Sequence, residues 1–322
     1  MSRPEPTRQD VGRLAPSPTG LLHLGHARTF LIAWWRARSV GARLLMRLED
    51  LDGPRAKPEM ADAALRDLAW LGLDWDGPAY VQSMGLAELS AAATQLERAG
   101  LAYACVCTRS DVRAAQSAPQ QGDSEPRYPG TCRGRFASLA SAEAETGKSA
   151  GLRLRVASGS IVVNDVLLGA RSFDVQAEVG DFLVAKRDGA PAYQLAAVVD
   201  DARQGVTEVV RGEDLLPSAA RQQLLQQALG LPGVRYCHVP LVLDEQGRRL
   251  AKRHDDLSLA ELRRGGTDPR AVVAWAARSC GMPVETRISA RDALASFDLA
   301  ALPPAAITLS GATIEALRSA RD

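Results

Sequence analysis

Two histidines in a proline- and glycine-rich stretch are the first residues whose spacing suggests chemistry. The stretch reads PSPTGLLHLGHART, with His23 and His26 on either side of Gly25. The apolar run Val11–Leu14 precedes it and a helical pattern follows, so it lies at a strand-to-helix turn. Such turns bind phosphate through backbone N–H groups and the helix dipole. The two imidazoles can face one ligand, and Gly25 lets a flat base approach the backbone. An ordinary helix start with surface histidines is the alternative.

Three of the five cysteines lie close together in the sequence and suggest a metal site. Cys105 and Cys107 are one residue apart, and Cys132 follows a polar stretch at residues 115–127, where we expect a mobile loop. Three thiolates leave one position of a tetrahedral zinc ion to be filled. We expect a structural ion that ties the ends of this loop together. Three reduced cysteines without metal are the alternative.

Composition excludes several classes of protein. The 322 residues carry a formal net charge of +1, so no strong overall field attracts the chain to nucleic acid or membrane, although a local basic patch stays open. No apolar run is long enough to span a bilayer, and the N-terminus lacks the apolar core of a signal peptide. The odd cysteine count argues against a disulfide framework. We expect a cytoplasmic monomer without a membrane partner.

Strand and helix signals alternate over the first hundred residues. Strands separated by helices predict a parallel sheet with helical crossovers, and so an α/β fold. This alternation of strands and helices is interrupted in the middle of the chain, where short β-like runs and a turn at Asp188-Gly189 indicate an insertion. After Ser258 the signals are helical. The predicted strands and helices of the α/β pattern are Val11–Leu14, Leu24–Arg38, Ala42–Leu48, Pro58–Leu71, Leu86–Ala99, Val206–Val210, Ala219–Leu229 and Tyr236–Leu243.

The string around the two histidines resembles the HIGH signature of class I aminoacyl-tRNA synthetases. The flanking segments RLAPSPTG and ART resemble the glutamyl branch of that family. The resemblance implies a Rossmann-like parallel sheet that binds ATP with Mg²⁺. It also implies that His23, Gly25 and His26 contact ATP and that the two histidines are catalytic.

The second signature of the family is a lysine-bearing loop, KMSKS. Its counterpart here is RLAKR at residues 249–253, a degenerate match that keeps Lys252. A lysine on such a loop can neutralise the charge that develops on the α-phosphate of ATP. The resemblance implies that Lys252 binds ATP and acts in catalysis with His23 and His26. The substrate carboxylate is itself the nucleophile, so no nucleophilic side chain is expected.

The resemblance also implies a pocket for L-glutamate. A guanidinium holds a carboxylate well, and Arg13 and Arg211 stand at the ends of predicted strands, where open α/β sheets bind ligands. Glu49 can receive the ammonium and Tyr193 can add a hydroxyl. Structural ion pairs of the two arginines with Glu49, Asp50 or Glu213 are the alternative. Positions that line the pocket in the glutamyl branch match Arg13, Leu14, Ala15, Pro16, Ser17, Glu49, Tyr193 and Arg211.

The same resemblance supplies the fourth ligand of the metal site. Relatives carry a tyrosine at the position of Tyr128, four residues before Cys132. The implied set around one structural Zn²⁺ is Cys105, Cys107, Tyr128 and Cys132.

About seventy residues follow Lys252, too few for the anticodon-binding domains of a discriminating glutamyl-tRNA synthetase. This layout, with RLEDLDGPR, GLDWDGP and VVDDARQGVTEVVRGEDLL, resembles glutamyl-Q tRNA(Asp) synthetases over residues 13–280. The resemblance implies transfer of glutamate to the cyclopentenediol of queuosine at the wobble position of tRNA(Asp). Candidates for contacts with tRNA phosphates are Arg248, Arg249, Arg253, Arg263 and Arg264.

The resemblance divides the chain into four parts. Residues 11–100 and 193–257 are expected to form the two halves of the catalytic domain. Residues 101–192 are expected to form an inserted α+β subdomain that bears zinc and binds the acceptor. Residues 258–322 are expected to form a short helical region.

Three other functions stay open. A minimal glutamyl-tRNA synthetase that charges tRNA(Glu) would share every catalytic residue. A non-catalytic paralogue could bind glutamate, ATP or tRNA as a sensor, although the kept histidines and Lys252 argue against it. A small-molecule nucleotidyltransferase would share the histidine motif but not the context of Arg13, Glu49 and Arg211.

Overall fold

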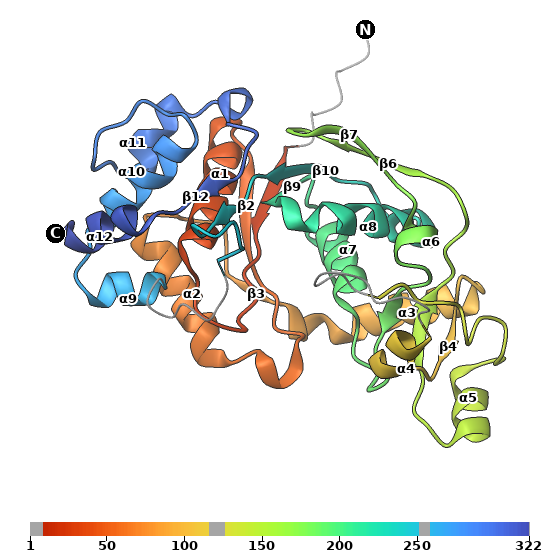
Figure 1. Cartoon of the computed structure of the whole chain (residues 1–322). Helices are drawn as coiled ribbons and strands as arrows, with labels where there is room; N and C mark the ends of the chain where they lie inside the picture. Colours follow the sequence, from red (N-terminus) through yellow and green to blue (C-terminus); the bar gives the residue numbers. More distant parts are fainter. Residues whose placement is uncertain (1–8, 116–125, 251–257, 322) are drawn as a thin grey trace, which may run out of the picture.

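Strands and helices alternate along most of the chain (Figure 1). The structure, a computed structural model, describes residues 9–115, 126–250 and 258–321. Its strands are β1 (Val11–Leu14), β2 (Arg43–Leu48), β3 (Tyr80–Val81), β4 (Ala102–Cys105), β5 (Gly151–Leu154), β6 (Ile161–Asp165), β7 (Gly169–Phe173), β8 (Leu183–Ala185), β9 (Glu208–Gly212), β10 (Arg235–Val239), β11 (Val242–Leu243) and β12 (Ile307–Thr308). Its α-helices are α1 (Leu24–Ser39), α2 (Pro58–Trp70), α3 (Leu86–Arg98), α4 (Arg109–Ala114), α5 (Leu139–Thr146), α6 (Val175–Glu178), α7 (Tyr193–Gln204), α8 (Leu216–Leu229), α9 (Leu259–Arg264), α10 (Pro269–Ser279), α11 (Ala290–Ala293) and α12 (Gly311–Ser319).

Two sets of parallel strands meet at β1 and β9. The first set runs β1-β2-β3, and the second runs β9-β10-β6. The backbone N of Thr207, just before β9, donates to the carbonyl of Val11 in β1 at 2.8 Å, which joins the two sets. Strand order therefore proceeds outward in both directions from β1 and β9. The carboxyl ends of these two strands border a topological switch point, where open α/β sheets bind ligands.

Local signals explain why the first helices begin and end where they do. The predicted helices Leu24–Arg38 and Pro58–Leu71 are confirmed to within one residue. Pro58 occupies the first turn of α2, where its missing N–H has no intrahelical partner to lose. Gly72 follows the end of α2 with φ of 80°, a left-handed conformation that glycine adopts without strain.

Two predictions about the sheet need correction. The predicted strand Tyr236–Leu243 is two strands, β10 and β11, because Pro240 has no N–H and cannot continue the ladder. Strand β11 pairs with β12, which the sequence analysis did not predict. The sheet is also not purely parallel, since β7 runs antiparallel to β6 and extends it at the edge.

The predicted insertion contributes to two sheets. Strands β4, β5 and β8 form a separate antiparallel sheet, with α4 and α5 nearby. The hairpin β6–β7 instead joins the central strands, because β6 pairs in parallel with β10. Residues 101–192 are therefore α+β, and hydrogen bonds connect them directly to the central sheet.

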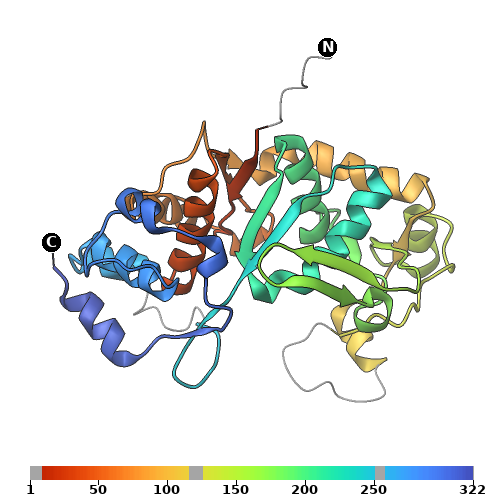
Figure 2. The ribbon, with the colours of Figure 1, turned by 90° about the horizontal axis from the view of Figure 1, so that it is seen from above.

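The C-terminal helices lie against α1, on the opposite side of the molecule from the insertion (Figure 2). One buried apolar cluster joins α1, β2 and α10, and a second lies between the central strands, α7 and α8. In the part of the chain that the structure describes, no helix combines the length and apolar character needed to cross a membrane. Three segments named above lie outside that part: the N-terminus (residues 1–8), most of the polar stretch (116–125), and residues 251–257 with Lys252 and Arg253.

Candidate active site

The two histidines cap the start of α1 and stack on each other. Nδ1 of His23 accepts from the backbone N of Gly25 at 3.1 Å and of His26 at 3.4 Å. Nδ1 of His26 accepts from the backbone N of His23 at 3.2 Å. The ring centroids are 3.7 Å apart. Because both Nδ1 atoms accept, each neutral ring carries its proton on Nε2, a donor suited to a phosphate oxygen.

Gly25 makes room for this stack. A Cβ at its position would lie 3.1 Å from Cε1 and Nδ1 of His23 and 3.6 Å from Cβ of Val242. The sequence analysis assigned the missing side chain to the approach of a base. In the structure, the imidazole of His23 lies against that space.

The segment that follows Lys252 is anchored at the histidine turn. Ser258 pairs with His23 in an antiparallel β-bridge, and the backbone N of Leu259 donates to the carbonyl of Leu22 at 2.8 Å. On the other side, Leu250 is buried. Lys252 itself lies outside the described residues, but the chain re-enters the described part beside the two imidazoles.

Arg13 ends β1 as a buried cation at the switch point. Its Nη1 donates to the carbonyl of Val210 in β9 at 3.0 Å. Among the described residues, no atom accepts a hydrogen bond from its Nε, and Oδ1 of Asp201 lies 3.8 Å away. Burial lowers the pKa of the Arg13 guanidinium. A buried donor with no acceptor is costly, and a bound carboxylate would relieve that cost.

Glu49 follows β2 and belongs to a buried charge network. Arg47 donates to Glu49 at 3.1 Å, to Asp201 at 2.7 Å and to Gln204 at 2.9 Å. Although burial opposes the charge, the carboxylates of Asp201 and Glu49 raise the pKa of Arg47 above its usual value. The backbone N of Glu49 donates to the carbonyl of Pro16 at 3.0 Å, which ties Glu49 to the proline-rich turn. Arg47 and Asp201 had no signal in the sequence, because their contact joins positions 154 residues apart.

Arg211, at the end of β9, is held by a histidine that the sequence analysis did not single out. Its Nε donates to Nε2 of His238 at 3.0 Å, and its Nη2 donates to the carbonyl of Leu215 at 3.2 Å. Nδ1 of His238 lies 2.6 Å from Oδ2 of Asp165 in β6. Burial lowers the pKa of His238. Burial acts against ionisation of Asp165, but hydrogen bonds from His238 and from the backbone of Leu168 lower its pKa.

The remaining pocket candidates surround the same point. Tyr193 begins α7 and is 39% exposed, and the charged groups that act on its hydroxyl include Glu49, Arg211 and Arg13. The turn after β1 places Leu14 and Pro16 inside the protein, Ala15 half-buried and Ser17 exposed. The structure therefore brings the carboxyl ends of β1, β2 and β9 and the first turn of α7 together in one region.

Among the described residues, the two arginines do not form the ion pairs with Glu49, Asp50 or Glu213 that were considered as an alternative, although Arg13 pairs with the buried Asp201 at 3.8 Å. Asp50 accepts from the backbone N of Ser83 at 2.8 Å, and Glu213 accepts from the backbone N of Leu241 at 3.3 Å. Glu49 pairs with Arg47 instead.

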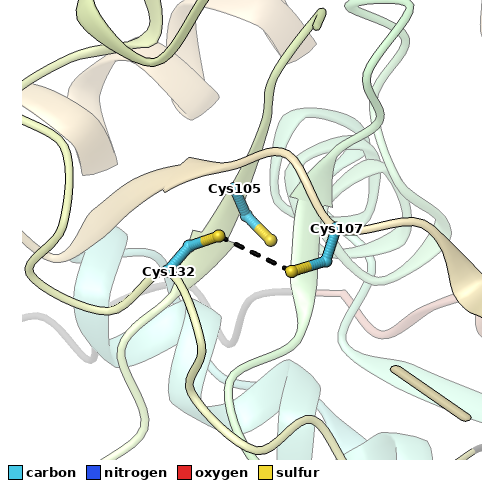
Figure 3. A group of neighbouring side chains, drawn as sticks. All are labelled: Cys105, Cys107 and Cys132. Carbon is cyan, nitrogen blue, oxygen red and sulfur yellow. Dashed lines mark hydrogen bonds between the residues drawn. The ribbon is translucent and has the colours of Figure 1, made fainter. Parts of the chain in front are cut away.

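The three cysteines of the predicted metal site converge, with their side chains directed at one another (Figure 3). Their Sγ atoms lie within 4.8 Å of one another, and Cys107 and Cys132 are 3.6 Å apart. The Tyr128 hydroxyl lies 3.3 Å from Sγ of Cys105 and 3.8 Å from Sγ of Cys107. Ligands bound at about 2.3 Å to a tetrahedral zinc ion lie about 3.8 Å apart, so this donor set has suitable spacing.

Arg153 borders the cysteine cluster and was missed in the sequence. Its Nε donates to Sγ of Cys105 at 3.2 Å, and its guanidinium carbon lies 3.8 Å from the ring centroid of Tyr128. Its positive charge offsets the negative charge that thiolates bring to such a site.

The described candidates for phosphate contacts form ion pairs on the surface. Arg248 pairs with Asp244 at 2.9 Å and Arg249 with Asp214 at 3.1 Å. Two others lie on α9, where Arg263 pairs with the buried Asp67 at 3.1 Å and Arg264 pairs with Glu261 at 2.6 Å. Arg253 lies outside the described residues.

Comparisons with known proteins agree with this geometry. The family described as tRNA synthetases class I (E and Q), catalytic domain, matches residues 11–299. The glutamyl-Q tRNA(Asp) synthetase of Nocardia farcinica is 46% identical, covering 92% of this chain and 92% of the relative. The glutamyl-Q tRNA(Asp) synthetase of Symbiobacterium thermophilum is 43% identical, and the match covers 95% of this chain and 98% of the relative.

A solved structure shares the architecture. The glutamate tRNA ligase from Elizabethkingia meningosepticum, in complex with its amino acid, superposes with a TM-score of 0.81 at 26% identity. The match covers 96% of this chain and 69% of that one. The chain therefore belongs to the glutamyl-Q tRNA(Asp) synthetases, a family of ligases built on the class I (E and Q) tRNA synthetase catalytic domain.

Proposed function

We propose that this ligase activates L-glutamate with ATP and transfers it to the queuosine cyclopentenediol at the wobble position of tRNA(Asp). The names of the relatives from Nocardia farcinica and Symbiobacterium thermophilum support this acceptor. One observation carries the glutamate assignment: Arg13 and Arg211 are buried at the carboxyl ends of β1 and β9, with Glu49 and Tyr193 around the same crevice.

Glutamate presents two carboxylates and an ammonium, and the crevice offers matching groups. Arg13 has a buried Nε–H without an acceptor among the described residues, so it suits a carboxylate. Arg211 is fixed through Nε and Nη2, which leaves donors on Nη1 for a second contact. Glu49 receives the ammonium, and Arg47 holds that carboxylate in place at 3.1 Å.

Activation is an in-line attack of the substrate carboxylate on the α-phosphate of ATP, with pyrophosphate as the leaving group. The Nε2–H groups of His23 and His26 bind phosphate oxygens at the start of α1, with Gly25 between them. Lys252 would neutralise charge at the α-phosphate, and Ser258, six residues after it, pairs with His23. Bound Mg²⁺ supplies further charge neutralisation on the phosphates. The protein's part is positioning and electrostatic stabilisation.

The cysteine cluster fits a structural zinc ion. Cys105, Cys107, Cys132 and Tyr128 would hold it, because their ligand atoms already lie at tetrahedral spacing. The ion would tie the segment after β4 to the return of the chain at Tyr128.

Residues 11–100 and 193–257 would form the catalytic domain, and residues 258–322 would form a supporting helical region. The acceptor tRNA would contact residues 101–192 and the basic side chains near the lysine segment. Arg248, Arg249, Arg263 and Arg264 would exchange their carboxylate partners for phosphates, and Arg253 would add a further phosphate contact. We propose a monomer that acts in the cytoplasm, where its tRNA substrate is found.

The test uses labelled glutamate, ATP and Mg²⁺ with three acceptors: tRNA(Asp) with queuosine, tRNA(Asp) with guanosine, and tRNA(Glu). We expect label on the first alone. Label on tRNA(Glu) would identify a minimal glutamyl-tRNA synthetase instead. No label and no glutamate-dependent pyrophosphate exchange would leave a binding protein without catalytic activity.

A further inference from the structure

A buried chain of three polar side chains ends at the substrate arginine. Asp165 in β6, His238 in β10 and Arg211 in β9 lie on adjacent parallel strands. Asp165 and His238 are 2.6 Å apart, and His238 and Arg211 are 3.0 Å apart. All three are at most 5% exposed, and His238 is completely buried.

The donors and acceptors of the three groups determine which nitrogen of His238 carries the proton. An arginine can only donate, so Nε2 of His238 must be the acceptor. The imidazole therefore carries its proton on Nδ1 and donates it to Asp165. Asp165 also accepts from the backbone N of His238 at 3.0 Å and of Leu168 at 2.9 Å, which keeps it ionised and in place.

We propose that His238 and Asp165 are positioning residues for glutamate: they hold the Arg211 guanidinium in the orientation that receives a substrate carboxylate. This inference rests on the proposed function of the same crevice. A long arginine side chain loses rotamer freedom when it binds a ligand, and orienting it beforehand removes that cost from binding. Arg13 is oriented by a different route, through the carbonyl of Val210 in β9.

The groups around His238 come from several elements. Arg211 faces it from β9 and Asp165 from β6, and Tyr236 of its own strand stacks at 5.9 Å between ring centroids. The guanidinium carbon of Arg211 lies 5.1 Å from the ring centroid of Tyr236. The imidazole accordingly links the hairpin β6–β7 to the substrate edge of β9.

A purely structural role for the chain is the competing explanation, and two substitutions at one position separate the two. In His238→Gln, the amide oxygen reaches the place of Nε2 and keeps the contact with Arg211, but the contact with Asp165 is lost. In His238→Asn, the shorter amide keeps the contact with Asp165 and no longer reaches Arg211. Each variant loses one buried hydrogen bond, so their stabilities should be similar.

The experiment is glutamate-dependent ATP–pyrophosphate exchange by the full chain, with thermal unfolding of each variant as a control. For His238→Asn we expect the KM for glutamate to rise about tenfold or more, with kcat and the KM for ATP within about threefold of wild type. For His238→Gln we expect the KM for glutamate to stay within about threefold of wild type.

Asp165→Asn is a second test of the positioning role. Its amide can donate to Nδ1, which moves the imidazole proton to Nε2, where it opposes the donor on Arg211. We expect a rise in the KM for glutamate like that of His238→Asn. Glu208→Gln is the matched control, because Glu208 holds Arg36 at 2.7 Å at the other end of β9. It should lower the unfolding temperature without changing that KM.

Equal KM values for glutamate in the Asn and Gln variants at position 238 would overturn the positioning role, whatever their stability. No glutamate-dependent exchange by the wild-type protein would instead overturn the proposed function, and the inference with it.

Discussion

The proposed glutamate pocket and the cysteine cluster are built in opposite ways. The cluster takes its ligand atoms from one short part of the chain, residues 105–132. In the crevice, Arg13 contacts a carbonyl 197 positions away, and His238 contacts a carboxylate 73 positions away. The cluster is assembled locally and, as proposed, would be completed by an ion, whereas the proposed pocket is assembled by the packing of the whole sheet. Substitutions in the two regions should therefore have different effects on activity and stability.

The largest expected effect is the loss of a crevice arginine. Arg211→Ala should lower kcat/KM for glutamate by about a hundredfold or more, because truncating one member of a buried charged contact leaves its partner unsatisfied. Pyrophosphate exchange at varied glutamate measures this. Arg318→Ala is the control, since Arg318 is half exposed and pairs with Glu315 on α12. A change of less than tenfold for Arg211→Ala would contradict its assignment to the pocket.

A substitution in the cysteine cluster should lower the stability of the protein without impairing glutamate activation. Cys132→Ala should abolish zinc binding and lower the unfolding temperature by about 5–10 °C, since a structural ion contributes directly to folding. The KM for glutamate should change less than about threefold, because the damage stays local.

Metal analysis and thermal unfolding check this prediction, with Cys237→Ala as the matched variant. Cys237 is fully buried in β10, away from the cluster, so its loss should reduce stability and leave zinc content unchanged. Wild-type protein without zinc, or a Cys132→Ala protein that keeps it, would contradict the metal site.

A smaller effect is the pH dependence of stability that His238 and Asp165 cause. His238 is buried and its pKa lies below the usual 6.5, so below pH 6.5 the unfolded chain binds a proton that the folded protein does not. Stability must then rise with pH in this range, by at most about 1.4 kcal/mol per pH unit from this group. Asp165 acts in the same direction at lower pH, because its pKa is lowered in the folded state.

Chemical denaturation at pH 5.5 and 7.5 tests this sign. We expect the difference in unfolding free energy between the two pH values to shrink in His238→Gln, which cannot bind the proton. An unchanged difference would show that other groups cause the pH dependence.

The same contrast explains what the sequence could and could not predict. The histidine turn and the cysteine cluster are local, so residue types and spacing were sufficient to find them. Helices with local start signals, the capping histidine of α1 and Pro58 of α2, were placed to within one residue. The break at Pro240 and the pairing of β11 with β12 depend on tertiary contacts, and the sequence analysis missed both.

The supporting residues of the crevice were missed for the same reason. Asp165 looks like a turn residue in the sequence, and His238 looks like one polar position in an apolar strand. Their roles follow only from parallel pairing of β6 with β10 and of β10 with β9, which brings Asp165, His238 and Arg211 side by side. Arg47 and Asp201 likewise meet only because β2 and α7 pack together.

The smallest expected effect lies at the histidine turn, which is local like the cluster but belongs to the proposed ATP site. Gly25→Ala should change the unfolding free energy by less than about 1 kcal/mol, because the better helix propensity of alanine offsets crowding against the His23 ring. The KM for ATP should nevertheless rise severalfold, since the displaced ring no longer presents Nε2 as before. Exchange kinetics at varied ATP and chemical denaturation of the variant measure the two effects. A stable variant with an unchanged KM for ATP would show that the stack of His23 and His26 is only a helix cap.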